Sequence, residues 1–187
     1  MASGKAFVTM DRLLEQTRSG PSHLLHPLIA DMVVVEAVQY NCNRLAHYHL
    51  HAFAVMPDHV HLLVTPLVPL PKLTKSLKGI TAKRANLMLG MTGNPFWQEE
   101  SYDRLVRDHS EFERIRNYIE ENPVRAGLVA HSAEYRWSST WVQGNDRPDL
   151  GVGRGPGSAL LAVDYSSRPW CNESDDQTQP CEPVAVA

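Results

Sequence analysis

The sequence has few cysteines and no long apolar run, and both absences narrow the classes of protein to consider. Its 187 residues contain three cysteines, Cys42, Cys171 and Cys181, and no C-x-x-C pair. Neither a disulfide framework nor a thiolate zinc site is therefore indicated. The opening MASGKAFVTM lacks the apolar core of a signal peptide, and no stretch approaches the roughly 20 apolar residues that cross a bilayer. We expect a cytoplasmic protein with no membrane partner.

Positive charge is also scarce when the whole chain is counted. The formal net charge is -3, which is not typical of a nucleic-acid-binding protein. Acids outnumber bases by seven to three after Trp141, however, so the part before it is slightly basic. The part after Gly144 is rich in Gly, Pro, Ser and Asp, a composition typical of disorder. We therefore expect one domain over residues 1–143 and a disordered tail over 144–187.

Apolar spacing and turn residues predict both strands and helices in the domain. The predicted strands span 6–10, 47–56, 59–66 and 102–108, and the predicted helices span 27–44, 72–90 and 110–123. Pro57 and Asp58 separate the second and third strands, which are therefore expected to form a hairpin. Ser110, with Glu113 three residues later, is the expected capping box of the last helix, and Pro123 is expected to end it.

The stretch VMPDHVHLLV (55–64) places two histidines one residue apart on a predicted strand. Alternate residues of a strand share a face, so His59 and His61 point the same way. Two imidazoles on one face can reach a single metal ion, although hydrogen-bonded or surface histidines are the plainer interpretation. The apolar run that follows favours the metal, because burying two imidazoles without partners is costly. Two nitrogens without a nearby thiolate leave positions open for substrate, which favours a catalytic ion.

A second candidate lies in RIRNYIEENPVRAGLV (114–129). Tyr118 borders the apolar face of the predicted helix, and Asn122 projects from the same side one turn later. Tyr118 could attack a substrate while the Asn122 side-chain oxygen holds a metal ion. The ordinary interpretation is a packed tyrosine and an asparagine that ends a helix before a proline. Both interpretations stay open on this stretch alone.

Candidate contacts to DNA phosphates are basic residues in two stretches. The first stretch has five positive charges and no acid, and the alternative is a solvated helix face. The candidates are Lys72, Lys75, Lys78, Lys83 and Arg84 in the first stretch and Arg104 and Arg107 in the second. Phe96 and Trp97 could stack on exposed bases, but core packing is the interpretation we favour for them.

Four stretches stand in a characteristic order: MPDHVHLL, FWQEESYDRLVRD, YIEENPVRAGLV and YRWSS. Together they resemble the REP-associated tyrosine transposases, which belong to the IS200-like, single-tyrosine branch of the HUH endonucleases. The resemblance extends over residues 25–141. It implies an α+β fold, a ferredoxin-like sandwich with an antiparallel sheet and helices packed on one face. The family usually has a fuller N-terminal strand than residues 6–10 offer.

The resemblance also implies roles for the candidate residues. His59 and His61 match the HUH pair that binds Mg²⁺ or Mn²⁺, Asn122 stands where the family has a third metal ligand, and Tyr118 matches the nucleophile. The implied substrate is single-stranded DNA folded into a palindromic hairpin. Attack by Tyr118 would form a 5′-phosphotyrosine and free a 3′-hydroxyl, and the covalent link would keep the energy needed for rejoining.

The resemblance leaves other properties open. A transposase of this kind would work in the cytoplasm, at the nucleoid, as a monomer or a homodimer. Two rival functions remain. One is a catalytically inactive DNA-binding protein of the same fold, and the other is a metal-dependent phosphodiesterase that uses water and keeps Tyr118 for structure.

Overall fold

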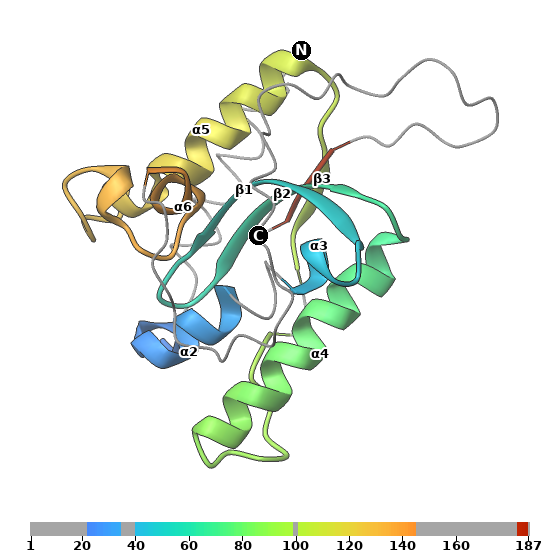
Figure 1. Ribbon diagram of the computed structural model, residues 1–187, viewed down its shortest axis with the longest axis vertical. Coiled ribbons are helices and arrows are strands. Elements are labelled where there is room, and N and C mark those ends of the chain that lie inside the picture. The colour runs from blue at the N-terminus through green and yellow to red at the C-terminus, as the bar shows by residue number, and fades with distance from the viewer. Residues whose placement is uncertain (1–21, 35–39, 99–100, 145–182, 187) are drawn as a thin grey trace, which may run out of the picture.

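The structure, a computed structural model, describes residues 22–34, 40–98, 101–144 and 183–186 (Figure 1). These residues contain a four-stranded antiparallel sheet in the order β1-β2-β4-β3. The strands are β1 (Tyr48–Val55), β2 (Val60–Pro66), β3 (Asp103–Leu105) and β4 (Val184–Val186). The helices are η1 (His23–Leu25), α2 (Pro27–Val33), α3 (Asn41–Asn43), α4 (Leu70–Met88), α5 (His109–Arg125), η3 (Ser132–Glu134) and α6 (Ser139–Gly144). The predicted α+β class and antiparallel sheet are confirmed.

Strands β1 and β2 form the predicted hairpin. Their register runs from Tyr48 opposite Pro66 to Val55 opposite Val60, with one irregularity near His51. The turn closes with a hydrogen bond of 2.8 Å from the Met56 N–H to the His59 carbonyl oxygen. Because side chains of paired residues share a face, this register places His61 on the same face as Ala54, while His59 lies just before the strand.

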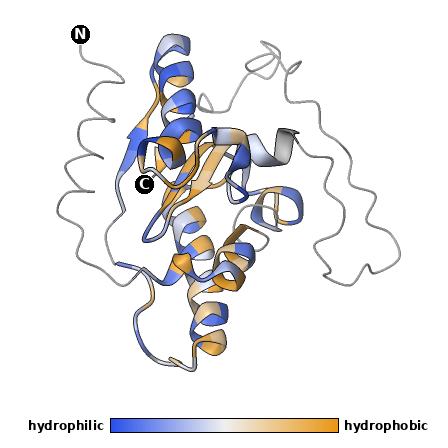
Figure 2. Cartoon of the chain, turned by 90° about the vertical axis from the view of Figure 1, so that its left-hand side faces the viewer, coloured by the Kyte–Doolittle hydropathy of each residue, from blue (hydrophilic) through white to orange (hydrophobic). Residues whose placement is uncertain are grey.

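Helices cover both faces of this sheet, whereas the resemblance implied one face (Figure 1). On the α2/α4 face, strand residues pack with helices α2 and α4, and on the α5 face they pack with α5. The α2/α4 face carries Phe53, Val55, Leu62, Val64, Val184 and Val186, and the α5 face carries Ala52, Ala54, Leu63 and Ala185. The physical reason is visible in the sequence, because AFAV and LLV are continuous apolar runs rather than alternating ones. Figure 2 shows the strands between the helices as largely hydrophobic.

Strand β4 comes from the C-terminal end of the chain and lies between β2 and β3. Val186 pairs with Leu62 on one side and with Asp103 on the other. All three strand residues are buried, so the predicted tail is wrong for this segment. The prediction averaged composition over the whole region and missed a short β-favouring stretch at its end. Residues 145–182, like the predicted strand 6–10, lie outside the described residues.

Helix α5 differs from its prediction at both ends. Its N-cap is Asp108, whose Oδ1 accepts from the Glu111 N–H at 2.7 Å, and not Ser110. At the other end the helix continues through Pro123 to Arg125. A proline this close to the end costs little, because few hydrogen bonds depend on it. Gly127, at φ +70°, then turns the chain away, as glycine after a helix commonly does.

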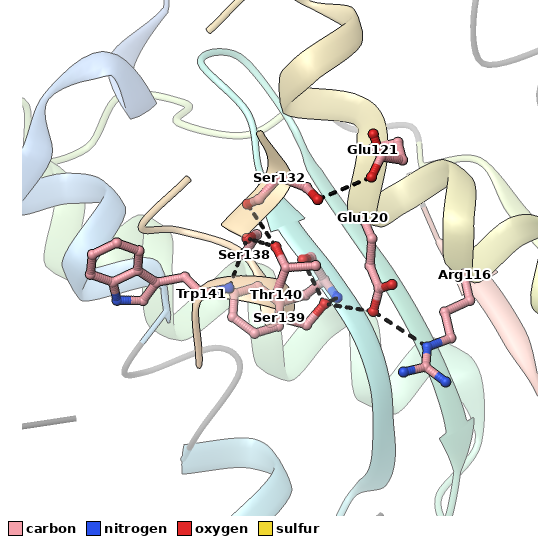
Figure 3. Close-up of polar contacts among 9 residues, drawn as sticks. Arg116, Glu120, Glu121, Ser132, Ser138, Ser139, Thr140 and Trp141 are labelled. Atoms are coloured by element: carbon pink, nitrogen blue, oxygen red, sulfur yellow. Dashed lines mark hydrogen bonds and ion pairs between the residues drawn. The ribbon is translucent and has the colours of Figure 1, made fainter. Parts of the chain in front are cut away.

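Residues 132–141 fasten α5 to β1. The Ser132 hydroxyl donates to Glu121 at 3.0 Å, and Ser139 lies 3.5 Å from Glu120, which also pairs with Arg116 (Figure 3). The Tyr135 hydroxyl donates to the Val55 carbonyl oxygen at 2.7 Å. Burial raises the pKa of this tyrosine to about 12, so it stays a donor at neutral pH. These bonds hold the helix that carries Tyr118 in place against the hairpin.

Candidate active site

A pocket of about 490 Å³ lies between the β1–β2 turn and the C-terminal half of α5. The turn contributes Met56, Pro57, Asp58 and His59, and the helix with its exit contributes Tyr118, Asn122, Arg125, Ala126 and Leu128. The pocket therefore joins two segments that are some sixty positions apart in the sequence.

The two histidines meet beside this pocket, which His59 lines. His59 Nε2 lies 2.8 Å from His61 Nε2, and both side chains are buried, His61 completely. On the other side of its ring, His59 Nδ1 lies 2.7 Å from the Asp58 carboxylate. When Nδ1 donates its proton to this carboxylate, Nε2 is left as an acceptor. Asp58 thus fixes the tautomer that a metal ligand needs.

Asn122 completes a set of three polar groups around His61. Its amide nitrogen lies 2.7 Å from His61 Nε2. His61 Nε2 cannot donate to His59 and accept from Asn122 in the same protonation state. If the Asn122 amide is turned so that its oxygen faces His61, that oxygen and the His59 Nε2 are both acceptors next to His61 Nε2, and a cation could then be shared among them.

The spacing of these atoms also fits a small cation. Neighbouring ligands of an octahedral ion with bonds of 2.0–2.1 Å lie about 3 Å apart, and the two observed spacings are 2.7 and 2.8 Å. Among the described residues, no three His, Cys, Asp or Glu side chains form such a group. Asn122, the third ligand that the resemblance implied, is the polar side chain that lies next to His61.

Tyr118 lies one helical turn before Asn122 and lines the same pocket. Its ring centroid is 6.1 Å from that of His61, in an edge-on arrangement. The side chain is only 3% exposed and packs in a cluster with Ile115 and Ile119. The structure thus brings Tyr118, His59, His61 and Asn122 together.

Two pocket residues were missed from the sequence, Asp58 and Arg125. Asp58 was assigned to a turn only, although a carboxylate next to a histidine pair is a signal for an orienting partner. Arg125 was missed because the helix was expected to end at Pro123. Once α5 continues, Arg125 falls seven residues after Tyr118 and on the same face.

The sequence around this site is similar to one known protein family. Residues 30–122 match the family model described as "Transposase IS200 like". Over this segment the chain is similar to the IS200-like transposases. The matched segment contains His59, His61, Tyr118 and Asn122. No match was found among curated proteins or among solved structures.

The match covers just under half of the chain. Transposases of the matched family act on DNA and generally depend on a divalent metal ion. In the described part of the chain, the helices are too short or too polar to span a membrane.

The predicted DNA contacts on α4 lie away from the pocket. Lys72, Lys75, Lys83 and Arg84 are exposed, whereas Lys78 is half-buried and its Nζ donates to the Gln98 carbonyl oxygen at 2.9 Å. Helices α4 and α5 pack on opposite faces of the sheet (Figure 1). The α4 cations can therefore hold only DNA that extends beyond the pocket.

The predicted contacts near β3 divide into two kinds. Arg104 donates from Nε and Nη2 to the fully buried Glu111 carboxylate, each at 2.9 Å. This ion pair ties β3 to α5, so the Arg104 guanidinium has a structural partner, and its predicted contact with DNA stays a prediction. Arg107 is exposed, and its backbone N–H also donates to Glu111, at 3.1 Å.

The two aromatic residues considered for base stacking pack against the core on the α2/α4 side. Phe96 stacks on His23 with ring centroids 5.5 Å apart, and Trp97 Nε1 donates to the Thr81 hydroxyl at 2.7 Å. This is the packing role that the sequence analysis favoured.

Proposed function

We propose that the protein is a metal-dependent endonuclease and strand transferase for single-stranded DNA, with Tyr118 as the nucleophile. In this proposal it is a REP-associated transposase of the HUH class that cleaves at palindromic hairpins. The observation that carries the proposal is that Tyr118, His59 and Asn122 line one pocket, with His61 buried directly behind them in contact with His59 and Asn122.

The histidine pair and Asn122 would hold Mg²⁺ or Mn²⁺. Two imidazole nitrogens and one amide oxygen suit Mn²⁺ better than Mg²⁺, which prefers oxygen ligands. When bound, the ion would polarise the scissile phosphate and stabilise its developing negative charge. Asp58 serves this set by holding the His59 ring in the required orientation and tautomer.

Tyr118 performs the covalent step. A bond forms between its phenol oxygen and phosphorus while the bond from phosphorus to the 3′-oxygen breaks, and the phenol proton is lost as the leaving oxygen gains one. The products are a 5′-phosphotyrosine and a free 3′-hydroxyl, and a second 3′-hydroxyl can reverse the step to join strands. Packing against Ile115 and Ile119 limits the motion of the ring, which favours a fixed direction of attack.

An adduct assay tests this proposal. Full-length protein is incubated with Mn²⁺ and a single-stranded palindromic oligonucleotide labelled on its 3′ fragment, and denaturing gels report a covalent protein–DNA species. We expect the species with wild type and with Tyr40→Phe, an exposed control, but not with Tyr118→Phe.

Each rival function has its own outcome in this assay. Cleavage that survives Tyr118→Phe would indicate a water-using phosphodiesterase. Retarded mobility on native gels with no covalent species in any variant would indicate an inactive DNA-binding protein.

A further inference from the structure

Arg125 occupies the last turn of α5, on the same helix face as Tyr118 and Asn122. These residues precede it by seven and three positions, which is the spacing of neighbours along one side of a helix. Its guanidinium carbon lies 5.1 Å from the centroid of the Tyr118 ring. Arg125 also lines the pocket and is itself exposed, so solvent and substrate can reach it.

The charge of Arg125 is not matched by any carboxylate in the described part of the chain. Three other arginines differ in this respect. Arg104, Arg116 and Arg136 each pair with an acid, at 2.9, 3.3 and 2.8 Å. The one acid that lines the pocket, Asp58, is engaged by His59. A permanent cation beside the candidate nucleophile therefore faces a cavity rather than a protein anion.

The chemistry of this side chain points to a phosphate. A guanidinium stays charged at every physiological pH and presents a planar fork of donors that matches phosphate oxygens. Stacking on the Tyr118 ring keeps the fork beside the phenol. A basic residue in the last turn of a helix can also serve only the helix dipole, and such a role would be indifferent to the charge of the DNA.

We infer that Arg125 is a further catalytic residue, which binds a non-bridging oxygen of the scissile phosphate and holds the phosphorus atom in front of Tyr118. This inference rests on the proposed function. Arg125 lies three residues beyond the segment that matches the transposase family, so the match assigns it no role. In this arrangement the metal ion held by the histidine site and the Arg125 guanidinium would contact the same phosphate inside the pocket.

The test removes the charge from either partner. Wild type and Arg125→Ala are compared on the normal hairpin and on hairpins with a methylphosphonate at the scissile position, with the two diastereomers separated. On normal DNA we expect Arg125→Ala to form the adduct about 10²–10³-fold more slowly, the loss typical of one donor to a developing anion. On the diastereomer whose methyl group replaces the oxygen bound by Arg125, the two proteins should react at equal rates.

Arg114→Ala is the matched control, because Arg114 is an exposed arginine on the same helix that lies about 16 Å away along the axis. It should keep the wild-type rate on all substrates. The inference would be overturned if wild type and Arg125→Ala form the adduct at nearly the same rate on normal DNA. It would also be overturned if a large difference in rate persists on both diastereomers.

A binding measurement separates this result from a failure of the proposed function. In the Tyr118→Phe background, which cannot form the adduct, fluorescence anisotropy reports affinity for the normal and the methylphosphonate hairpins. We expect about tenfold preference for the charged phosphate, lost when Arg125→Ala is added. Absence of an adduct with wild type would refute the proposed function, whereas equal preference with and without Arg125 would refute the inference.

Discussion

The two faces of the sheet differ in the size of their side chains. The α5 face presents three alanines beside Leu63 and His61. The α2/α4 face presents larger side chains, among them Phe53, Leu62 and several valines. The α5 face is the one that carries the pocket, whereas the α2/α4 face carries most of the bulky core. Small side chains on a strand let a helix approach closely, as packing at interior density requires.

The consequence is visible at His61. Ala54 is its cross-strand partner, and no large side chain stands there between β1 and α5. The Asn122 amide can therefore lie 2.7 Å from His61 Nε2. Large apolar residues on the other face contribute roughly 1.5–3 kcal/mol each on burial. One face thus supplies stability, and the other supplies the close approach that the site needs.

Strand β4 belongs to both faces, and its removal gives the largest expected effect. Deleting residues 183–187 withdraws Val184 and Val186 from the α2/α4 face and Ala185 from the α5 face, and leaves β2 and β3 without their shared partner. Two buried valines alone contribute roughly 3–6 kcal/mol, a large part of the stability of a domain. We expect loss of the cooperative urea transition measured by circular dichroism.

The matched variant replaces Val184 and Val186 by threonine. It keeps β-branched side chains and the strand pairing but reduces apolar burial, so an intermediate stability is expected. A truncated protein that unfolds cooperatively at the wild-type urea concentration would show that β4 contributes nothing.

The features of the site that could be predicted from the sequence are local ones. The period of two on a strand put His59 and His61 on one side, and the period near four on a helix put Tyr118 and Asn122 on one side. The hairpin followed from a proline and an aspartate between two apolar runs. None of these predictions needs a contact between distant segments.

The features that could not be predicted depend on the tertiary structure. Nothing near Val184 indicates that it pairs with β2 and β3, about 120 positions and 80 positions away. The ion pair of Arg104 with the buried Glu111 could not be predicted either, because it depends on how β3 and α5 pack. A proline usually ends a helix, so the sequence does not predict that α5 continues to Arg125 and places it on the same side as Tyr118.

A second prediction concerns another imidazole that packs toward α5. The His51 ring meets Phe112 edge-on at 5.0 Å, and its Nε2 lies 2.7 Å from the Thr65 hydroxyl. Burial lowers the pKa of His51 to about 4, and the neighbouring His49 and Arg116 add to the effect. As pH falls below about 6.5, His51 becomes protonated in the unfolded chain but stays neutral in the folded protein until the pH nears 4.

Stability should therefore decline from pH 6.5 to about 4 by at most about 3 kcal/mol and then level off with respect to this group. Urea unfolding at several pH values measures the slope. His51→Gln, which keeps a hydrogen-bonding group, should flatten it, while His49→Gln at an exposed position should not. Equal slopes in wild type and His51→Gln would contradict the assignment.

A third prediction enlarges one residue on each face at the same end of the hairpin. Ala54→Leu adds volume between β1 and α5, which should cost about 1–3 kcal/mol. It should also shift Tyr118 and Asn122 away from His61. A displacement of about 1 Å can cost about 10²-fold in rate, so adduct formation should fall more than stability suggests.

Val60→Leu is the paired change on the α2/α4 face, where Val60 is only partly buried. It should leave the rate of adduct formation near that of wild type. Equal losses of rate in the two variants would mean that the close approach of α5 is not what the small residues provide.

The smallest expected effect comes from the exposed cations of α4, on the face away from the pocket. Neutralising Lys72, Lys75 and Lys83 together to glutamine should remove up to three phosphate contacts. For single-stranded DNA each contact contributes about 0.7 to the slope of log affinity against log salt, so the slope should fall by about 2. Filter binding over a range of salt concentrations measures this slope. Lys78→Gln is the control and should change the slope less, because the Lys78 ammonium already donates to a backbone carbonyl.

At saturating DNA the rate of adduct formation should stay unchanged, because these lysines contact DNA outside the pocket. A triple variant that keeps both the wild-type salt slope and the wild-type rate would place the DNA on the α5 face alone and leave the basic face of α4 as a solvated surface.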